Sequence, residues 1–385
     1  MKNYSEYVSV IDITSFLWFC IFSLLIVKLT RSFSERNQLY FLVFFLIHCI
    51  LSLVFIYSSP LPEFSDTHTF AKLVKATEWN IVQSKGVEFW FYLSYLFRLA
   101  SGFSLVSYLF LQVFFFYLSV IMMLLAFENF ENNKASNRSV SIYILLVSLF
   151  PSVLLYIDQP LREAWLLLGF SLSLFSISLI KLKGGKVKYI NLLFIGCVLT
   201  ILTRPQLIIC YTLLYLFFIG VSRRNFIFIV VMFALSPFAF TALTGYDFEP
   251  AFFAYIRNSQ ISNSPVDSVY GSVEWNSFID IIFDMPLLTL QFILSPLPIL
   301  HNNAFVSMKA LALVFLYMVV IFFFAAMSNS KSKYKYFLVY MSFSVIFSVW
   351  EFYIGAAIRH RFPLDLLFFP LAANYLSGVR GGDER

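Results

Sequence analysis

The chain has 385 residues, of which 60% are hydrophobic and only 12% are charged, and its mean hydropathy is +0.82. Soluble globular proteins carry roughly 25% charged residues, so this composition excludes an ordinary soluble domain. The formal net charge of +6 reflects how basic residues are shared among membrane loops, and it does not indicate nucleic-acid binding. Many apolar runs are about 20 residues long, which is enough for a helix to cross a bilayer. We therefore predict an all-α polytopic membrane protein, built as a single bundle over residues 1–385.

The apolar runs predict about 11 membrane-spanning helices, with a range of about 10–13. In chain order the predicted spans cover residues 9–27, 39–57, 102–126, 139–157, 163–180, 189–203, 205–221, 225–243, 304–327, 336–356 and 362–378. Two long polar segments interrupt the spans, at 59–101 and 244–303. Within them, residues 68–98 and 277–300 have the pattern of amphipathic helices that lie at a membrane interface.

Most basic residues lie in alternate short segments, at 28–36, 134–138, 181–188, 223–224, 331–335 and 380–385. Because cytoplasmic loops are enriched in Lys and Arg, this pattern places these segments inside and the two long polar segments outside. It also predicts an outer N-terminus and an inner C-terminus. The short turns around 158–163, 204–205 and 355–361 then face the outside as well.

The first long outer segment contains the acidic candidate Asp66, in the sequence SDTHTFAKL. A carboxylate in a partly desolvated cleft can act as a general base toward an acceptor hydroxyl. Asp66 also precedes a helical pattern, so helix N-capping is its alternative role. His68, two residues later, is a candidate for assisting Asp66, with a structural role as the alternative.

Six arginines are predicted at the outer face, outside the positive-inside pattern: Arg98, Arg162, Arg204, Arg257, Arg359 and Arg361. Charged groups at membrane depth are costly and usually functional. A planar guanidinium binds phosphate oxygens through two parallel hydrogen bonds, so we predict that these arginines bind a substrate phosphate. For each one, an interfacial anchor or a salt bridge is the alternative, such as Arg162 with Asp158 or Glu163.

Soluble nucleotide chemistry is not predicted, because the motifs that it requires are absent from the sequence. The sequence has no Walker loop, GxGxxG, HExxH or nucleophile elbow, and the predicted inner loops are too short to form such a site. The four cysteines lie in apolar runs without metal-ligand spacing. No cofactor and no metal ligand are assigned, and the use of a divalent cation stays open.

Three stretches resemble the GT-C class of polytopic glycosyltransferases, which use polyprenyl-phosphate-linked sugars. SDTHTFAKL is similar to the acidic motif in the first outer loop of that class. LFPSVLLYIDQPLREAWLLLGFSLSLF looks like its span, short outer turn and span, and AIRHRFPLDLLFFPLAANY resembles its late arginine-and-proline motif. The resemblance implies that Asp66 is the catalytic base, and that Arg162, Arg204, Arg359 and Arg361 form a cradle for lipid phosphate.

Two other functions remain open. A bacterial O-antigen or capsule polymerase also has two large outer loops and functional outer arginines, and segment 244–303 with Arg257 suits its second loop. A flippase or other transporter of lipid-linked oligosaccharide would need charges deep along a central path. The charges here are predicted to stop at the outer rim, which argues against transport.

The predicted function is therefore that of a glycosyltransferase in bacterial surface polysaccharide biosynthesis, meaning O-antigen, capsule or lipopolysaccharide. It is expected in the inner (cytoplasmic) membrane, with its site facing the periplasm or the cell exterior. The expected partners are a polyprenyl-linked sugar donor, a glycan or lipid acceptor and membrane lipids, with other polysaccharide-assembly proteins as further candidates; nucleic acid is not one. Trp79, Trp90 and Tyr270 are candidates for stacking on sugar rings, with interfacial anchoring as the alternative.

Overall fold

The computed structural model describes residues 13–58, 65–77, 85–203, 208–220, 247–262, 269–270, 272–295, 306–351 and 354–378, with isolated positions between 227 and 241. The described chain is helical and contains no β-strand. Its residues form two compact units, each described separately below. Unit 1 contains Met1–Ile208, Tyr317–Lys333 and Leu366–Arg385, and unit 2 contains Ile209–Leu316 and Tyr334–Asp365. The single domain over 1–385 stays a prediction, because two compact units can belong to one folding domain.

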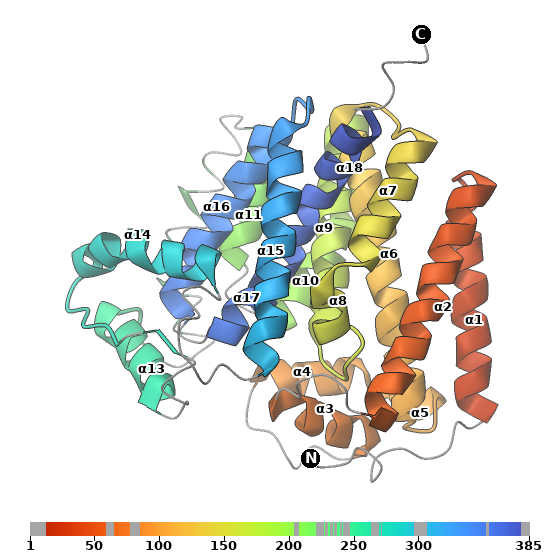
Figure 1. The fold of residues 1–385 in the computed structure, drawn as a ribbon. Helices are drawn as coiled ribbons and strands as arrows, with labels where there is room; N and C mark the ends of the chain where they lie inside the picture. Colours follow the sequence, from red (N-terminus) through yellow and green to blue (C-terminus); the bar gives the residue numbers. More distant parts are fainter. Residues whose placement is uncertain are drawn as a thin grey trace. The chain divides into compact units, whose positions relative to one another are not determined.

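Unit 1 contains most of the helices in Figure 1. They are α1 (Ile13–Leu29), α2 (Glu35–Ser58), α3 (Ser65–Lys75), α4 (Lys85–Leu93), α5 (Tyr95–Ala100), α6 (Leu105–Glu131), α7 (Asn137–Ser148), α8 (Pro151–Tyr156), α9 (Glu163–Lys183), α10 (Val187–Thr203), the 3₁₀ turn η4 (Leu366–Phe368) and α18 (Phe369–Gly378). Helix α15 (Val306–Met327) begins in unit 2 and ends in unit 1.

Helix α6 is the centre of unit 1. Its side chains are buried on nearly every side, and it packs against α1, α2 and α9. A helix that is apolar all round belongs in the interior of a bundle, whereas a surface helix has one apolar stripe. The composition of α6 therefore explains its central place.

Helices α9 and α10 pack closely because small residues face each other. A Cβ atom built on Gly196 would lie 2.5 Å from Ser173 Oγ and 2.8 Å from Ser173 N. A Cβ atom on Gly169 would in turn overlap the Thr200 side chain and approach the Gly196 carbonyl to 3.0 Å. Gly169 with Ser173, and Gly196 with Thr200, are each four residues apart, which is the small-residue spacing of closely packed membrane helices.

Three described helices are long and apolar enough to cross a membrane, judged by length and composition: Glu35–Tyr57, Leu105–Glu131 and Glu163–Lys183. Shorter apolar helices cover Ile13–Leu29, Val187–Thr200 and Ala312–Met327. The described residues are therefore all-helical, with apolar helices of the kind that cross membranes. The count of about 11 spans stays a prediction.

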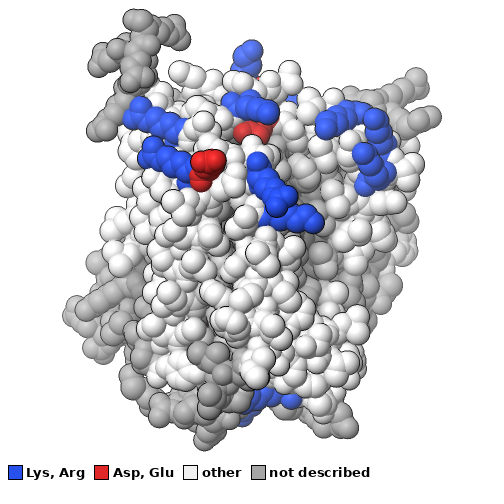
Figure 2. Space-filling model, turned by 90° about the vertical axis from the view of Figure 1, so that its right-hand side faces the viewer, with Lys and Arg blue, Asp and Glu red and all other residues white. Residues whose placement is uncertain are grey.

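The basic loops of unit 1 gather at one end. The connections from α1 to α2 and from α6 to α7 both lie at the upper end of Figure 1, and Lys28, Arg31, Lys134 and Arg138 there are exposed. Figure 2 shows Lys and Arg side chains near this end, above a broad band of uncharged residues. This distribution agrees with the alternation of basic loops in the sequence, whereas the orientation in a membrane stays a prediction.

Three predicted elements differ from the structure. The span predicted at 139–157 is broken, because α7 ends at Ser148 and Pro151 begins α8 after Phe150 in an extended conformation. The turn predicted at 355–361 is wrong, since α17 (Ile354–Asp365) continues through it as a helix. The last predicted span, 362–378, is divided among the end of α17, η4 and α18.

The first long outer segment is helical where it is described, with α3, α4 and α5 in sequence. Phe70, Leu73 and Val74 on α3 are buried together, as the amphipathic pattern predicts. Ile81, in the same predicted amphipathic segment 68–98, lies outside the described residues. Trp90 on α4 is fully buried and donates its Nε1 hydrogen to the Tyr108 hydroxyl at 3.0 Å. It is therefore a core residue, and stacking on a sugar is wrong for Trp90.

Unit 2 contains α11 (Ile208–Ile219), α13 (Pro250–Ser262), α14 (Phe278–Leu294), α16 (Lys333–Trp350) and α17. An apolar cluster joins α13 to α14 and to the segment between them: Phe253, Ala254, Val273, Trp275, Ile281 and Leu288, with Val349 of α16 packed against it. Asn258 fixes the connecting segment, because its amide bonds both the N–H and the carbonyl of Val273. Helix α14 begins with a capping box between Ser277 and Asp280.

Candidate anion-binding site

Arg257 is the residue around which the polar part of unit 2 is built. It lies on α13 with only 1% of its surface exposed. Its Nη1 donates to the carbonyls of Ser348 (3.1 Å), Val349 (3.4 Å) and Glu351 (2.5 Å), at the C-terminal end of α16. The last carbonyls of a helix have no partner within that helix, and a cation stabilises their partial negative charge. Arg257 is thus a helix C-cap supplied by another element.

The other edge of the Arg257 guanidinium has no protein acceptor. Its Nε and Nη2 are buried, and no described residue accepts a hydrogen bond from them. These two N–H groups point in the same direction, which is the geometry that binds two oxygens of a phosphate or carboxylate. Burying a donor without an acceptor costs about 1–3 kcal/mol. An oxyanion on this edge would remove that cost.

Glu351 connects Arg257 to His360. Its backbone carbonyl accepts from Arg257, while its carboxylate Oε2 lies 2.5 Å from His360 Nδ1. The Glu351 side chain is 3% exposed and that of His360 is 20% exposed. The His360 ring also packs on Phe347 of α16, with centroids 5.7 Å apart. One carboxylate therefore holds the imidazole in place next to the arginine.

Arg361, on the same helix as His360, caps a second helix. Its Nη1 donates to the carbonyls of Phe292 and Ile293, and its Nη2 to that of Ser295 at 2.9 Å, at the end of α14. The Tyr270 hydroxyl donates to the Gln291 carbonyl at 2.9 Å in the same region. Arg361 and Tyr270 thus hold the C-terminal end of α14 within unit 2.

The electrostatics of this region are set by burial. Burial lowers the pKa of the Arg257 guanidinium, and the charges of Glu351, Tyr270 and Asp284 counteract that fall. Burial raises the pKa of Tyr270 to about 12, which Arg361 and Arg257 oppose. Arg257 and Arg361, two of the six arginines predicted at the outer face, therefore both favour the ionised form of the Tyr270 hydroxyl within unit 2.

Arg98 has a different place from the one predicted. It is fully buried on α5, donating to the carbonyls of Leu73 and Ala76 (2.7 Å each) and of Phe91 (2.8 Å), and to the Ser94 hydroxyl. Its guanidinium carbon lies 3.9 Å from the centre of the Phe91 ring, and burial lowers its pKa to about 10. These contacts show that Arg98 joins α3, α4 and α5. They use the guanidinium donors that phosphate binding would need, and the phosphate-binding role of Arg98 stays a prediction.

The remaining predicted residues lie apart or outside the described residues. Arg162 is half-buried at the N-cap of α9, and Arg359 is half-buried on α17. Arg204 lies outside the described residues, and so do the side chains of Asp66 and His68, although both positions belong to α3. Their roles stay predictions.

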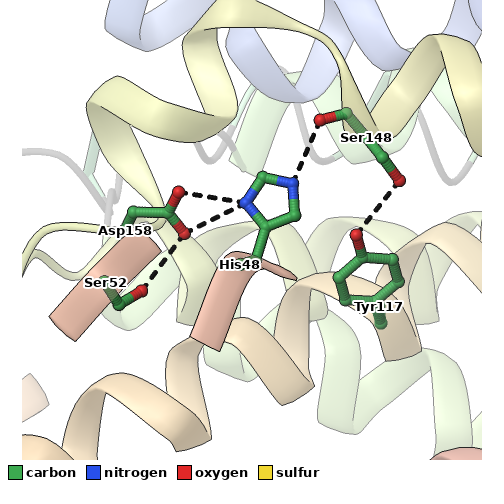
Figure 3. Close-up of polar contacts among 5 residues, drawn as sticks. All are labelled: His48, Ser52, Tyr117, Ser148 and Asp158. Carbon is green, nitrogen blue, oxygen red and sulfur yellow. Dashed lines mark hydrogen bonds and ion pairs between the residues drawn. The ribbon is translucent and has the colours of Figure 1, made fainter. Parts of the chain in front are cut away.

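A second polar cluster is buried in unit 1 (Figure 3). His48 of α2 places Nδ1 3.0 Å and 3.2 Å from the two carboxylate oxygens of Asp158, and Nε2 3.0 Å from the Ser148 carbonyl. Ser52 donates to Asp158 at 3.2 Å, and the hydroxyls of Tyr117 and Ser148 are 3.0 Å apart. Both ring nitrogens face acceptors, so the geometry fits an imidazolium that donates from each.

The His48–Asp158 pair corrects the prediction that charges stop at the outer rim. Both side chains are 1% exposed, and His48 lies about 20 Å along α2 from its Glu35 end at 1.5 Å per residue. That position is inside the candidate span Glu35–Tyr57. Asp158 comes from the segment between α8 and α9, next to the break in the helix predicted at 139–157. The prediction is therefore wrong for this pair.

The sequence patterns did not single out His48, Glu351 or His360 as site residues. Each sits in an apolar or aromatic stretch without a motif. The partner of His48, Asp158, is 110 residues away along the chain. A buried histidine in an apolar span was the one signal available. Within the described residues, no group of three or more His, Cys, Asp or Glu could hold a metal ion.

Comparisons with known proteins found no match of any kind. No protein-family model matches the chain, and neither a curated protein nor a solved structure is similar to it at a significant level. The functional conclusion therefore depends on the residues and contacts described above.

Proposed function

We propose that this protein is a membrane glycosyltransferase that takes sugar from a polyprenyl-phosphate or polyprenyl-diphosphate donor during bacterial surface polysaccharide synthesis. The observation that carries the proposal is the edge of Arg257 formed by Nε and Nη2, which is buried without an acceptor among the described residues. A phosphate matches this edge in charge and in the spacing of its oxygens. The sequence resemblance to GT-C enzymes supports a lipid-linked sugar as the source of that phosphate.

In this reaction Arg257 stabilises the negative charge that develops on the phosphate as the glycosidic bond breaks. Donors already fixed in a buried site stabilise developing charge without reorganising, and such contacts commonly contribute a few kcal/mol each to catalysis. Arg257 is fixed because its Nη1 is bonded to the end of α16. Asp66 keeps its proposed role as general base on the strength of the resemblance, and the site is proposed to face the periplasm or cell exterior.

The experiment is a comparison of surface glycans in a strain lacking the gene. The proposal predicts the loss of one sugar with chain length intact, restored by the wild-type gene but not by Arg257→Gln. Arg138→Gln changes an exposed arginine at the basic end of unit 1 and serves as the matched control, which should restore the glycan. An unchanged glycan in the deletion strain would contradict the proposal.

A polymerase is the second candidate, favoured by the position of Arg257 in the second long polar segment. It predicts that the deletion strain accumulates a single repeat unit on its acceptor lipid. A transporter is the third candidate, favoured by the buried His48–Asp158 pair beside a helix break. It predicts lipid-linked glycan on the cytoplasmic leaflet. The same strain thus distinguishes all three.

A further inference from the structure

His48 of α2 contacts both ends of the segment that contains α8. Its Nε2 lies 3.0 Å from the carbonyl oxygen of Ser148, the last residue of α7. Its Nδ1 lies 3.0 Å and 3.2 Å from the two carboxylate oxygens of Asp158, which follows α8. Figure 3 shows the ring between these two acceptors. One imidazole therefore joins the two ends of residues 149–157 to α2.

The two contacts of His48 need two protons. A carbonyl oxygen and an ionised carboxylate accept hydrogen bonds and cannot donate them, so each contact needs a proton between its heavy atoms. In the contact with Asp158, that proton can sit on Nδ1 or on the carboxylate. When one proton leaves, a single proton remains for both contacts, and one contact then brings two acceptors together. Such a contact is unfavourable in a buried place, because neither acceptor can bond to water.

The groups around the pair leave this proton as the charge that can change. Both side chains are 1% exposed, and among the described residues the Asp158 charge is the one that acts on His48. The Asp158 charge also acts on Cys49 of α2 and on Tyr117 of α6. An unperturbed thiol or phenol is neutral at neutral pH, and the hydroxyl of Ser52 does not titrate in that range.

We infer that His48 and Asp158 form a proton-binding site that keeps residues 149–157 joined to α2 while the proton is bound. When the proton leaves to water, the contact with Ser148 or the contact with Asp158 is lost, and the segment is released at that end. Arg162, the N-cap of α9, follows four residues after Asp158, so the release would reach one of the predicted phosphate ligands. This switch does not depend on the proposed glycosyl transfer, and it fits a transferase, a polymerase or a transporter.

A fixed ion pair that never changes its proton is the simpler role, and two substitutions separate it from the switch. In Asp158→Asn the side-chain amide donates to Nδ1, so a neutral His48 satisfies both contacts by donating from Nε2. In His48→Gln the pair has no basic nitrogen left. Tyr117→Phe is the matched control, because it removes the hydroxyl 3.0 Å from Ser148 Oγ and keeps the pair.

The test is hydrogen exchange of the full chain in lipid nanodiscs, measured by mass spectrometry. It runs from about pH 6 to about pH 9, around and above the ordinary histidine pKa of about 6.5, with labelling times scaled to the intrinsic exchange rate at each pH. In the wild type, the protection factors of residues 149–157 should fall by about 10–100-fold as the pH rises, which corresponds to one charge-assisted hydrogen bond. Those of α6 should stay constant. Tyr117→Phe should show the same fall, whereas Asp158→Asn and His48→Gln should show none.

Three outcomes would overturn the inference. Protection of residues 149–157 that is independent of pH in the wild type would mean a fixed ion pair. A fall of the wild-type size in both Asp158→Asn and His48→Gln would mean that the loss does not need this proton. An equal fall throughout α6 would mean that the whole unit opens rather than the segment. Protection of α6 at the wild-type level identifies folded variants, and His48→Gln decides the test if Asp158→Asn does not fold.

Discussion

Replacing His48 by alanine removes the imidazole that lies 3.0 Å and 3.2 Å from the two carboxylate oxygens of Asp158. The carboxylate, 1% exposed, would keep the Ser52 hydroxyl at 3.2 Å as a described donor. Removing one partner of a buried ion pair costs about 3–5 kcal/mol, because the remaining charge is left without compensation. We expect His48→Ala and Asp158→Leu each to lose stability in this range.

The double variant His48→Leu/Asp158→Leu should be more stable than either single variant, because replacing both charges by apolar groups is often close to neutral. The assay is unfolding in mixed micelles with increasing SDS, followed by tryptophan fluorescence. Ile50→Ala on α2, whose side chain is 59% exposed, is the matched control and should change stability little. Additive losses in the double variant, or single losses below about 1 kcal/mol, would refute the assignment of a buried charged pair.

Two further predictions concern helix packing and helix capping. Gly196→Val should destabilise the α9–α10 pair by about 1–3 kcal/mol in the same unfolding assay, because its Cβ would lie 2.5 Å from Ser173 Oγ. Gly185→Ala is the control and should not destabilise the protein, because no atom lies within 4 Å of the added Cβ. Equal effects of the two substitutions would contradict the close packing. Hydrogen bonds from the Ser277 backbone hold the pKa of the Asp280 carboxyl below its ordinary value. Its stabilisation of α14 is therefore full at neutral pH and is lost as the pH falls through that lowered value. Relative to the intrinsic exchange rate at each pH, the protection of α14 amides should fall in acid for the wild type, and Asp280→Asn should show low protection already at neutral pH. Protection factors independent of pH in the wild type would contradict this.

Hydropathy located the helices because runs of about 20 apolar residues have few alternative structures. The break after Ser148 was visible in the sequence only as Pro151, and a proline inside an apolar run does not show whether the helix bends or ends. The turn predicted at 355–361 was wrong for the opposite reason. Its charged residues suggested a loop, whereas Arg361 is buried and its charge is satisfied by the carbonyls of α14.

The arginines were easy to find in the sequence, but their partners were not. Arg257 bonds to a carbonyl 91 residues away, and Arg361 to one 69 residues away. Those acceptors are backbone groups at helix ends, which any residue type can provide, so no sequence motif marks them. The same limit explains why an arginine expected to bind phosphate, Arg98, instead joins three helices.

The most direct test of the central claim is the binding of undecaprenyl phosphate to the full chain in lipid nanodiscs, compared between the wild type and Arg257→Gln. If the Nε–Nη2 edge of Arg257 binds phosphate, loss of two charge-assisted hydrogen bonds, each worth about 1.5–3 kcal/mol, should weaken binding by about 10²-fold or more. Arg98→Gln, at an arginine whose donors are bonded within the protein, should leave the affinity of the folded fraction unchanged. Equal affinity of the wild type and Arg257→Gln would contradict the claim.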